Sequence, residues 1–236
     1  MRIKICGIQN ETEMAAAIRC GADVLGFQVG QIYQSKSFIL PSTAGRLAAE
    51  LPPYVTPVIV THLSEPEAIV DILNKSAIFT VQLHKVTPVQ VAVLRDLLPA
   101  NAKIILTFYL NPGRYDWTLD EYLSLIDAVN LDAFNLDLSR VGLDTADKVY
   151  QWERAAEFVA QCPRPVMLSG GLNAANVAQA IETVHPFGVD ACNQLKAPDQ
   201  FCDPAVCHQF VQAARLAGMA LNPPPEIPDG KVSNLI

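Results

Sequence analysis

The chain has 236 residues, of which 50% are hydrophobic, and this length and composition are typical of one large domain or two small ones. Its 17 Lys and Arg against 24 Asp and Glu give a formal net charge of −7, and the absence of a basic run argues against nucleic-acid binding. No apolar stretch approaches the roughly 20 residues that span a bilayer, which argues against a membrane protein and leaves small molecules or proteins as the expected partners.

Short apolar runs alternate with longer segments of helical period along the chain. The apolar runs are nearly continuous, as strands buried on both faces require. They predict strands over Ile3–Cys6, Val24–Phe27, Pro57–Val60, Phe79–Leu83, Ile104–Phe108, Ala133–Leu136, Val166–Leu168 and Gly188–Ala191. The periodic segments predict helices over Glu11–Cys20, Thr43–Glu50, Glu67–Asn74, Val89–Leu98, Leu119–Ala128, Trp152–Gln161, Ala174–Val184 and Pro204–Ala217.

This alternation of strand and helix, repeated eight times, favours a closed (β/α)₈ barrel of the α/β class over an open sheet. The barrel domain is predicted over residues 1–218. Residues 219–236 are proline-rich and predict a C-terminal tail, because proline does not continue a helix. We expect a loose extended end rather than an arm that docks on the barrel or on a neighbouring subunit. The sequence leaves both a monomer and a homodimer open.

The six cysteines are expected to be free thiols because of the predicted cellular compartment. The start of the chain lacks the long apolar segment of a signal peptide, so we expect a cytoplasmic protein with free thiols and no structural disulfide. Four possible metal ligands lie within a short stretch of sequence: Cys192, Cys202, Cys207 and His208. Their spacing lacks the closely paired cysteines of structural zinc sites. No metal site is therefore predicted.

Side chains suited to chemistry follow the carboxyl ends of the predicted strands. Cys6 ends the first strand, His84 follows the fourth and Asp137 follows the sixth. In a closed barrel these ends surround one mouth, where residues far apart in sequence meet. A thiolate and a carboxyl group there suit acid–base work, in which one takes a proton from carbon and the other gives one to oxygen. A buried packing role for Cys6 and a capping role for Asp137 are the alternatives.

Gly170 and Gly171, after the seventh strand, predict a phosphate site. Glycines let backbone N–H groups approach an anion, and a helix that starts near Ala174 would add its positive end. Barrels often hold phosphate here, with the next strand–helix junction supplying the other half. A tight turn without a ligand is the alternative.

Five segments together resemble the phosphoribosylanthranilate isomerase family of tryptophan biosynthesis: Lys4–Ile8 (KICGI), Ala22–Phe27 (ADVLGF), Leu51–Pro53 (LPP), Val81–His84 (VQLH) and Leu168–Val177 (LSGGLNAANV). The similarity runs from Arg2 to about residue 217. It implies a (β/α)₈ barrel that isomerises an N-glycosylamine phosphate by an Amadori rearrangement, without metal or organic cofactor. Matched by motif, Cys6 falls on the general base that removes the C2′ proton. Asp137 falls on the general acid that protonates the ribose ring oxygen.

The chain departs from this family around the ligand. Ser37 replaces the arginine expected to meet the anthranilate carboxylate, and Lys36 compensates only if it turns inward. A glycine-rich loop becomes residues 144–148, Asp-Thr-Ala-Asp-Lys, whose carboxylates would repel a phosphate. The Gly after the Gln-Leu-His motif becomes Lys85.

The eighth strand carries the fourth departure, where Ser-Ser-Gly becomes Cys192-Asn193-Gln194. The backbone N–H groups of Asn193 and Gln194 would then have to hold the phosphate, with Lys196 adding charge. These changes leave three interpretations: an active family isomerase, a paralogue that isomerises a different amino-sugar, and a non-catalytic barrel that binds a small ligand or a protein.

Lys4 has the same strand parity as Cys6, one layer deeper. We expect it inside the barrel, paired with Asp190 in a purely structural ion pair. The alternative is that its charge also lowers the pKa of the thiol above it.

Overall fold

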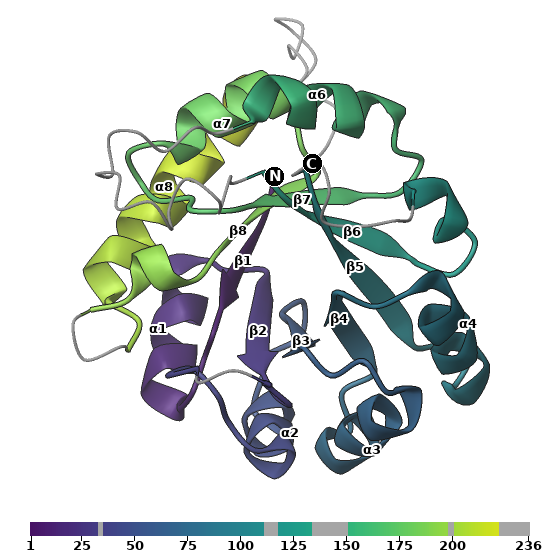
Figure 1. The fold of residues 1–236 in the computed structure, drawn as a ribbon. Coiled ribbons are helices and arrows are strands. Elements are labelled where there is room, and N and C mark those ends of the chain that lie inside the picture. Colours follow the sequence, from purple (N-terminus) through teal and green to yellow (C-terminus); the bar gives the residue numbers. More distant parts are fainter. Residues whose placement is uncertain (33–34, 111–117, 134–150, 198–200, 222–236) are drawn as a thin grey trace, which may run out of the picture.

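Eight parallel strands follow one another around a closed barrel in chain order, which confirms the predicted fold class (Figure 1). The computed structural model describes residues 1–32, 35–110, 118–133, 151–197 and 201–221. The strands are β1 (Arg2–Cys6), β2 (Val24–Gln28), β3 (Thr56–Thr61), β4 (Thr80–His84), β5 (Lys103–Tyr109), β6 (Ala128–Asp132), β7 (Val166–Ser169) and β8 (Gly188–Ala191).

The helices form a ring outside the strands (Figure 1). They are α1 (Glu11–Cys20), α2 (Pro41–Ala49), α3 (Pro66–Ser76), α4 (Pro88–Leu97), α6 (Trp152–Gln161), α7 (Val177–Val184) and α8 (Pro204–Leu221), with the short 3₁₀ helices η1 (Leu119–Glu121) and η3 (Asn193–Leu195). Local signals set several starts, since proline opens α2, α3 and α4, where its missing N–H is harmless. None of the described helices is long and apolar enough to cross a membrane.

The sixth β/α unit differs from the prediction. The strand is Ala128–Asp132 rather than Ala133–Leu136, and the expected helix Leu119–Ala128 is only the three residues of η1. The cause lies in a repeat, because residues 127–132 read Asp-Ala-Val-Asn-Leu-Asp and residues 132–137 read Asp-Ala-Phe-Asn-Leu-Asp. Both copies carry the same strand pattern, and the prediction took the second, which extends beyond the described residues.

Contacts around Asp127 explain why the first copy forms the strand. Its Oδ2 accepts the backbone N–H of Ile104 at 2.8 Å and pairs with Arg95 Nη2 at 2.7 Å. Arg95 also donates to the carbonyl of Leu125 at 2.6 Å. The Leu125 carbonyl is therefore bound by a side chain instead of by a continuing helix. Asn130 completes the placement, since its Nδ2 donates to Asp190 inside the barrel at 2.8 Å.

An ion pair fills the barrel interior below the mouth. Lys4 Nζ lies 2.6 Å from Asp190 Oδ2, with the two side chains 1% and 8% exposed, which confirms the expected pairing. Lys4 also donates to Gln82 Oε1 at 2.9 Å. Both charges are thus removed from water and depend on each other.

Lys4→Met is expected to lower the free energy of unfolding by about 3–5 kcal/mol, because it leaves the Asp190 carboxylate buried without its cation. Urea unfolding measures the change. The matched control is Lys75→Met, which removes an exposed pair with Asp71 and should cost no more than about 0.5 kcal/mol. Equal free energies of unfolding of the Lys4→Met variant and the wild-type protein would show that the Asp190 carboxylate does not need its cation.

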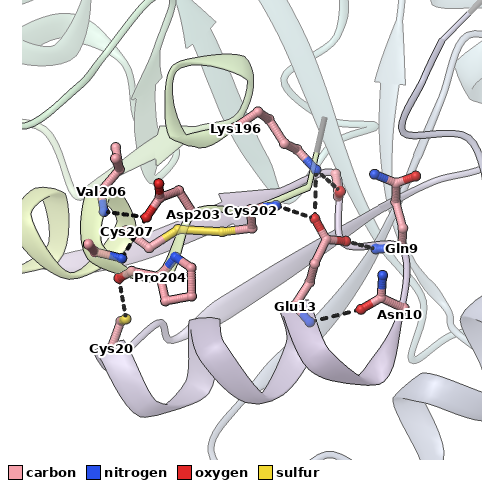
Figure 2. Close-up of a disulfide and its surroundings, with 12 residues drawn as sticks. Gln9, Asn10, Glu13, Cys20, Lys196, Cys202, Asp203, Pro204, Val206 and Cys207 are labelled. Carbon is pink, nitrogen blue, oxygen red and sulfur yellow. Dashed lines mark hydrogen bonds and ion pairs between the residues drawn. A yellow bond between two sulfur atoms is a disulfide. The ribbon is translucent and has the colours of Figure 1, made fainter. Parts of the chain in front are cut away.

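Cys202 and Cys207 form a disulfide at the start of α8, so the expectation of no structural disulfide is wrong (Figure 2). That expectation rested on the predicted compartment, which does not indicate which cysteines lie side by side in the fold. Glu13 of α1 accepts the backbone N–H of Cys202 and pairs with Lys196 Nζ at 3.1 Å, joining this corner to α1 (Figure 2). The bonded sulfurs of Cys202 and Cys207 are also not available as metal ligands.

Candidate active site at the barrel mouth

A cavity of about 400 Å³ opens at the carboxyl ends of the strands. Six of the residues predicted for the site line it together: Cys6, His84, Gly170, Gly171, Asn193 and Gln194. The barrel topology accounts for this meeting, because the carboxyl ends of all parallel strands lie at one rim.

Cys6 is the last residue of β1 and is 6% exposed. Glycines make room for it, since a Cβ added at Gly26 on the neighbouring strand would lie 2.8 Å from Cys6 Sγ. Gly7 ends the strand with φ of +82° and donates its N–H to the Gly26 carbonyl at 2.9 Å. The sequence Cys-Gly thus turns the chain directly after the thiol and leaves the thiol at the cavity wall.

The surroundings of Cys6 favour its thiolate. A hydrogen bond with Cys192 lowers the pKa of Cys6, burial raises it and the positive charge of Lys4 lowers it, and together these effects bring it to about 7. The same hydrogen bond and burial raise the pKa of Cys192 well above its usual value. One thiol of the pair therefore ionises near neutral pH while the other keeps its proton.

Alkylation of Cys6 by iodoacetamide is expected to accelerate through a midpoint near pH 7, since only the thiolate reacts and its pKa is about 7. Cys192→Ala should move this midpoint to higher pH, because the thiolate loses its hydrogen-bond donor. Mass spectrometry of the modified peptide measures the rate. Cys20, whose pKa is raised by burial, is the internal control and should react only at higher pH. An unchanged midpoint in Cys192→Ala would show that the hydrogen bond from Cys192 does not lower the pKa of Cys6.

Asp132 supplies a carboxyl group at the same cavity. It is the last residue of β6, aligned with Ser169 of β7, and lines the cavity on a strand separated from β1 by β7 and β8. The predicted acid Asp137 lies outside the described residues. Asp132 was missed because the strand was assigned to the second copy of the repeat, although the first copy ends on the same Leu-Asp pair.

The glycine turn after β7 faces the junction after β8. Gly170 and Gly171 have φ of 99° and 71°, a region that glycine adopts readily, and they line the cavity with Asn193 and Gln194. The expected helix start near Ala174 is wrong, since α7 begins at Val177. The two turns therefore line this part of the mouth, and the first turn of α7 does not.

Two lysines expected near the ligand, Lys196 and Lys36, lie elsewhere. Lys196 Nζ donates to the Gly7 carbonyl at 2.5 Å and pairs with Glu13, so it ties β8 to α1 instead of offsetting the lost glycine (Figure 2). Lys36 is exposed and does not turn inward. Ser37 is buried behind Gly7 and is not among the described residues that line the cavity. Residues 144–148 lie outside the described residues.

Two histidines form an aromatic part of the cavity wall. The rings of His62 and His84 stack with centroids 4.3 Å apart, and His84 Nδ1 lies 2.8 Å from Tyr109 Oη. Burial lowers the pKa of His62 and, more strongly, that of His84, so both rings are neutral at neutral pH. His62 was missed, although it directly follows β3 and carries the strand-end signal that identified His84.

A family model and individual relatives match most of the chain. The family model described as N-(5'phosphoribosyl)anthranilate (PRA) isomerase matches residues 3–193. N-(5'-phosphoribosyl)anthranilate isomerase 2 of Methanosarcina mazei is 37% identical over 217 residues, 91% of this chain and 94% of that protein. The isomerase of Halobacterium salinarum is 33% identical over 213 residues, 90% of this chain and 95% of that protein.

Solved structures agree with these relatives. The crystal structure of phosphoribosyl anthranilate isomerase from Thermotoga maritima has a TM-score of 0.75 at 28% identity and covers 91% of this chain and 98% of its own. A phosphoribosyl anthranilate isomerase in complex with reduced 1-(o-carboxyphenylamino)-1-deoxyribulose 5-phosphate has a TM-score of 0.72 at 28% identity, with the same coverage.

Proposed function

The chain belongs to the N-(5'-phosphoribosyl)anthranilate isomerase family, and from this premise we propose that it isomerises phosphoribosylanthranilate in tryptophan biosynthesis. The reaction is an intramolecular aldose–ketose conversion of an N-glycosylamine phosphate. One observation carries the proposal: a thiol with a pKa of about 7 and a carboxyl group line one cavity together with a double-glycine turn. The cavity thus offers a base, an acid and backbone donors for a phosphate.

The chemistry divides between Cys6 and Asp132. Asp132, as general acid, gives a proton to the ribose ring oxygen while the C1′–O bond breaks and the nitrogen lone pair forms an iminium ion. The Cys6 thiolate then takes the C2′ proton, and the resulting enolamine tautomerises to the ketose. A base with a pKa of about 7 is matched to this step near neutral pH. The backbone of Gly170, Gly171 and residues 193–194 anchors the phosphate and holds C2′ over the thiol.

Complementation tests the proposed function. The gene is expected to support growth without tryptophan of a bacterium that lacks its own isomerase, while a Cys6→Ser, Asp132→Asn double variant should not. Western blotting confirms that both proteins accumulate. Failure of the wild-type chain to complement, despite accumulation, would contradict the proposal and favour a barrel that binds a ligand without turnover.

A second candidate function keeps the chemistry and changes the amine of the substrate. It is favoured by Ser37, which stands buried where the resemblance implies an arginine, and by the exposed Lys36 beside it. The neutral rings of His62 and His84 present an aromatic surface that fits an aryl group without requiring its carboxylate. A paralogue with these features would isomerise another aryl or alkyl amino-sugar phosphate.

Removing the carboxylate from the substrate is expected to change kcat/KM by less than about tenfold, because no arginine is among the described residues that line the cavity. An arginine clamp contributes about 1.5–3 kcal/mol, which would make the loss larger than tenfold. The measurement compares phosphoribosylanthranilate with the phosphoribosyl derivative of aniline. A clear preference for the aniline derivative would favour the paralogue, and a loss well above tenfold would show that another group binds the carboxylate.

We also place the enzyme in the cytoplasm. The base must stay a reduced thiol, and the described residues contain four free cysteines: Cys6, Cys20, Cys162 and Cys192. A reducing compartment keeps such thiols in this state, and there the buried Cys202–Cys207 disulfide has to resist reduction. The oligomeric state, monomer or homodimer, stays a prediction.

A further inference from the structure

Cys6 ends β1, and Cys192 directly follows β8, the strand that pairs with β1. The register between β1 and β8 pairs Lys4 with Asp190 and Ile5 with Ala191, and Cys6 and Cys192 are the residues that follow this last pair. Neighbouring strands of a sheet lie about 4.8 Å apart. Disulfides span Cα distances of about 4.4–6.8 Å, so the backbones of β1 and β8 already stand at the separation that a disulfide needs.

The two side chains also point into the same space. Both residues line the cavity, and Cys192 packs against the small cluster that contains Cys6. The thiols share a hydrogen bond, and Gln28 Nε2 lies 3.5 Å from Cys192 Sγ on the cavity side. A Cβ added at Gly7 would lie 3.1 Å from Cys192 Sγ, so the glycine after the base also leaves room for the second thiol.

We propose that Cys6 and Cys192 form a reversible disulfide that switches the enzyme off when peroxide rises. The loss of activity rests on the proposed function, in which Cys6 is the base, whereas formation of the bond depends only on the two thiols. The resemblance described above implies serine at position 192, and serine has no sulfur to bond. A barrel with serine at this position therefore could not form the disulfide, whereas this chain has both thiols.

The chemistry balances with hydrogen peroxide as the oxidant. The Cys6 thiolate attacks one peroxide oxygen, an S–O bond forms, the O–O bond breaks, and the leaving hydroxide takes up a proton as water. The Cys192 sulfur then attacks the Cys6 sulfenic acid, so that the S–S bond forms and the S–O bond breaks. The departing hydroxide leaves as water with the proton of Cys192. Each cysteine loses one electron, and the peroxide gains two.

The electrostatics assign the two roles in this sequence. Cys6, with a pKa of about 7, is the thiol that peroxide oxidises, because the thiolate is the nucleophile. Cys192 keeps its proton until the sulfenic acid forms beside it and then resolves it. Resolution also protects Cys6, since a sulfenic acid without a neighbouring thiol is oxidised further to sulfinic acid, which reductants do not reverse.

Peptide mapping tests the bond directly. The reduced protein is treated with hydrogen peroxide, its free thiols are blocked, and its tryptic peptides are examined by mass spectrometry. Arg164 precedes Pro165, so trypsin leaves Cys162 and Cys192 in one peptide. The Cys162→Ser variant is therefore the protein to map. We expect a peptide joined through Cys6 and Cys192 that dithiothreitol separates. Oxidation of Cys6 without this joined peptide would overturn the inference.

Activity provides the second readout. In the Cys162→Ser protein, peroxide should abolish isomerase activity in parallel with the bond, and dithiothreitol should restore it. In Cys192→Ser, which retains the Cys202–Cys207 disulfide, Cys6 should reach sulfinic acid and the lost activity should not return. Full recovery of Cys192→Ser would overturn the switch. A protein that forms the bond but never isomerises the substrate would refute the proposed function while supporting the thiol pair.

Discussion

Cys6→Ser is expected to lower kcat/KM for phosphoribosylanthranilate by about 10²–10⁴-fold, the range that general base catalysis contributes. Serine preserves the size of the side chain but is far too weak an acid to form the corresponding anion near neutral pH. The loss should fall mainly on kcat, because we propose that the turns after β7 and β8, and not the thiol, hold the phosphate.

The control for this variant is Cys20→Ser. Cys20 is a free thiol at the end of α1, outside the described lining of the cavity, and its removal should leave kcat/KM close to wild type. Thermal unfolding of both variants checks that the barrel is intact. Turnover by Cys6→Ser at the wild-type rate would show that the thiolate is not the base.

Asp132→Asn is expected to reduce kcat/KM by a similar factor, about 10²–10⁴-fold, because asparagine cannot protonate the ring oxygen. Asp132 ends β6 and lines the cavity, and the contacts of Asp127 and Asn130 hold that strand in place. The steady-state rate of ring opening and isomerisation measures the loss.

Asp137→Asn is the matched comparison, because Asp137 ends the second copy of the same six-residue pattern. Its variant is expected to retain most of the activity. The reverse result, with Asp137→Asn inactive and Asp132→Asn active, would mean that the second copy supplies the acid and would overturn the assignment of Asp132.

The sequence predicted the barrel and most of its strands, because each strand is a continuous apolar run between clear turn signals. It also predicted Cys6 and the Lys4–Asp190 pair, whose positions follow from strand parity and closure. The same rules failed at β6, where two overlapping copies satisfy them equally. Tertiary contacts select between the copies, namely those of Asp127 with Ile104 and Arg95 and that of Asn130 with Asp190.

The remaining differences at the site depend on contacts that no local pattern encodes. Lys196 could be placed near the phosphate from sequence, but its ion pair with Glu13 requires knowledge of how α1 packs against the end of β8. The disulfide between Cys202 and Cys207 and the facing thiols of Cys6 and Cys192 likewise depend on which segments lie side by side. His62 could have been predicted from the sequence, since it lies at the end of a strand as His84 does.

The most direct test of the central claim is turnover of phosphoribosylanthranilate by the purified, reduced protein, with the carboxyphenylamino-deoxyribulose phosphate followed by chromatography. We predict formation of this ketose at a rate that rises through about pH 7 with ionisation of Cys6 and that is lost in Cys6→Ser. Binding of the phosphorylated substrate without formation of the ketose at any pH would contradict the claim.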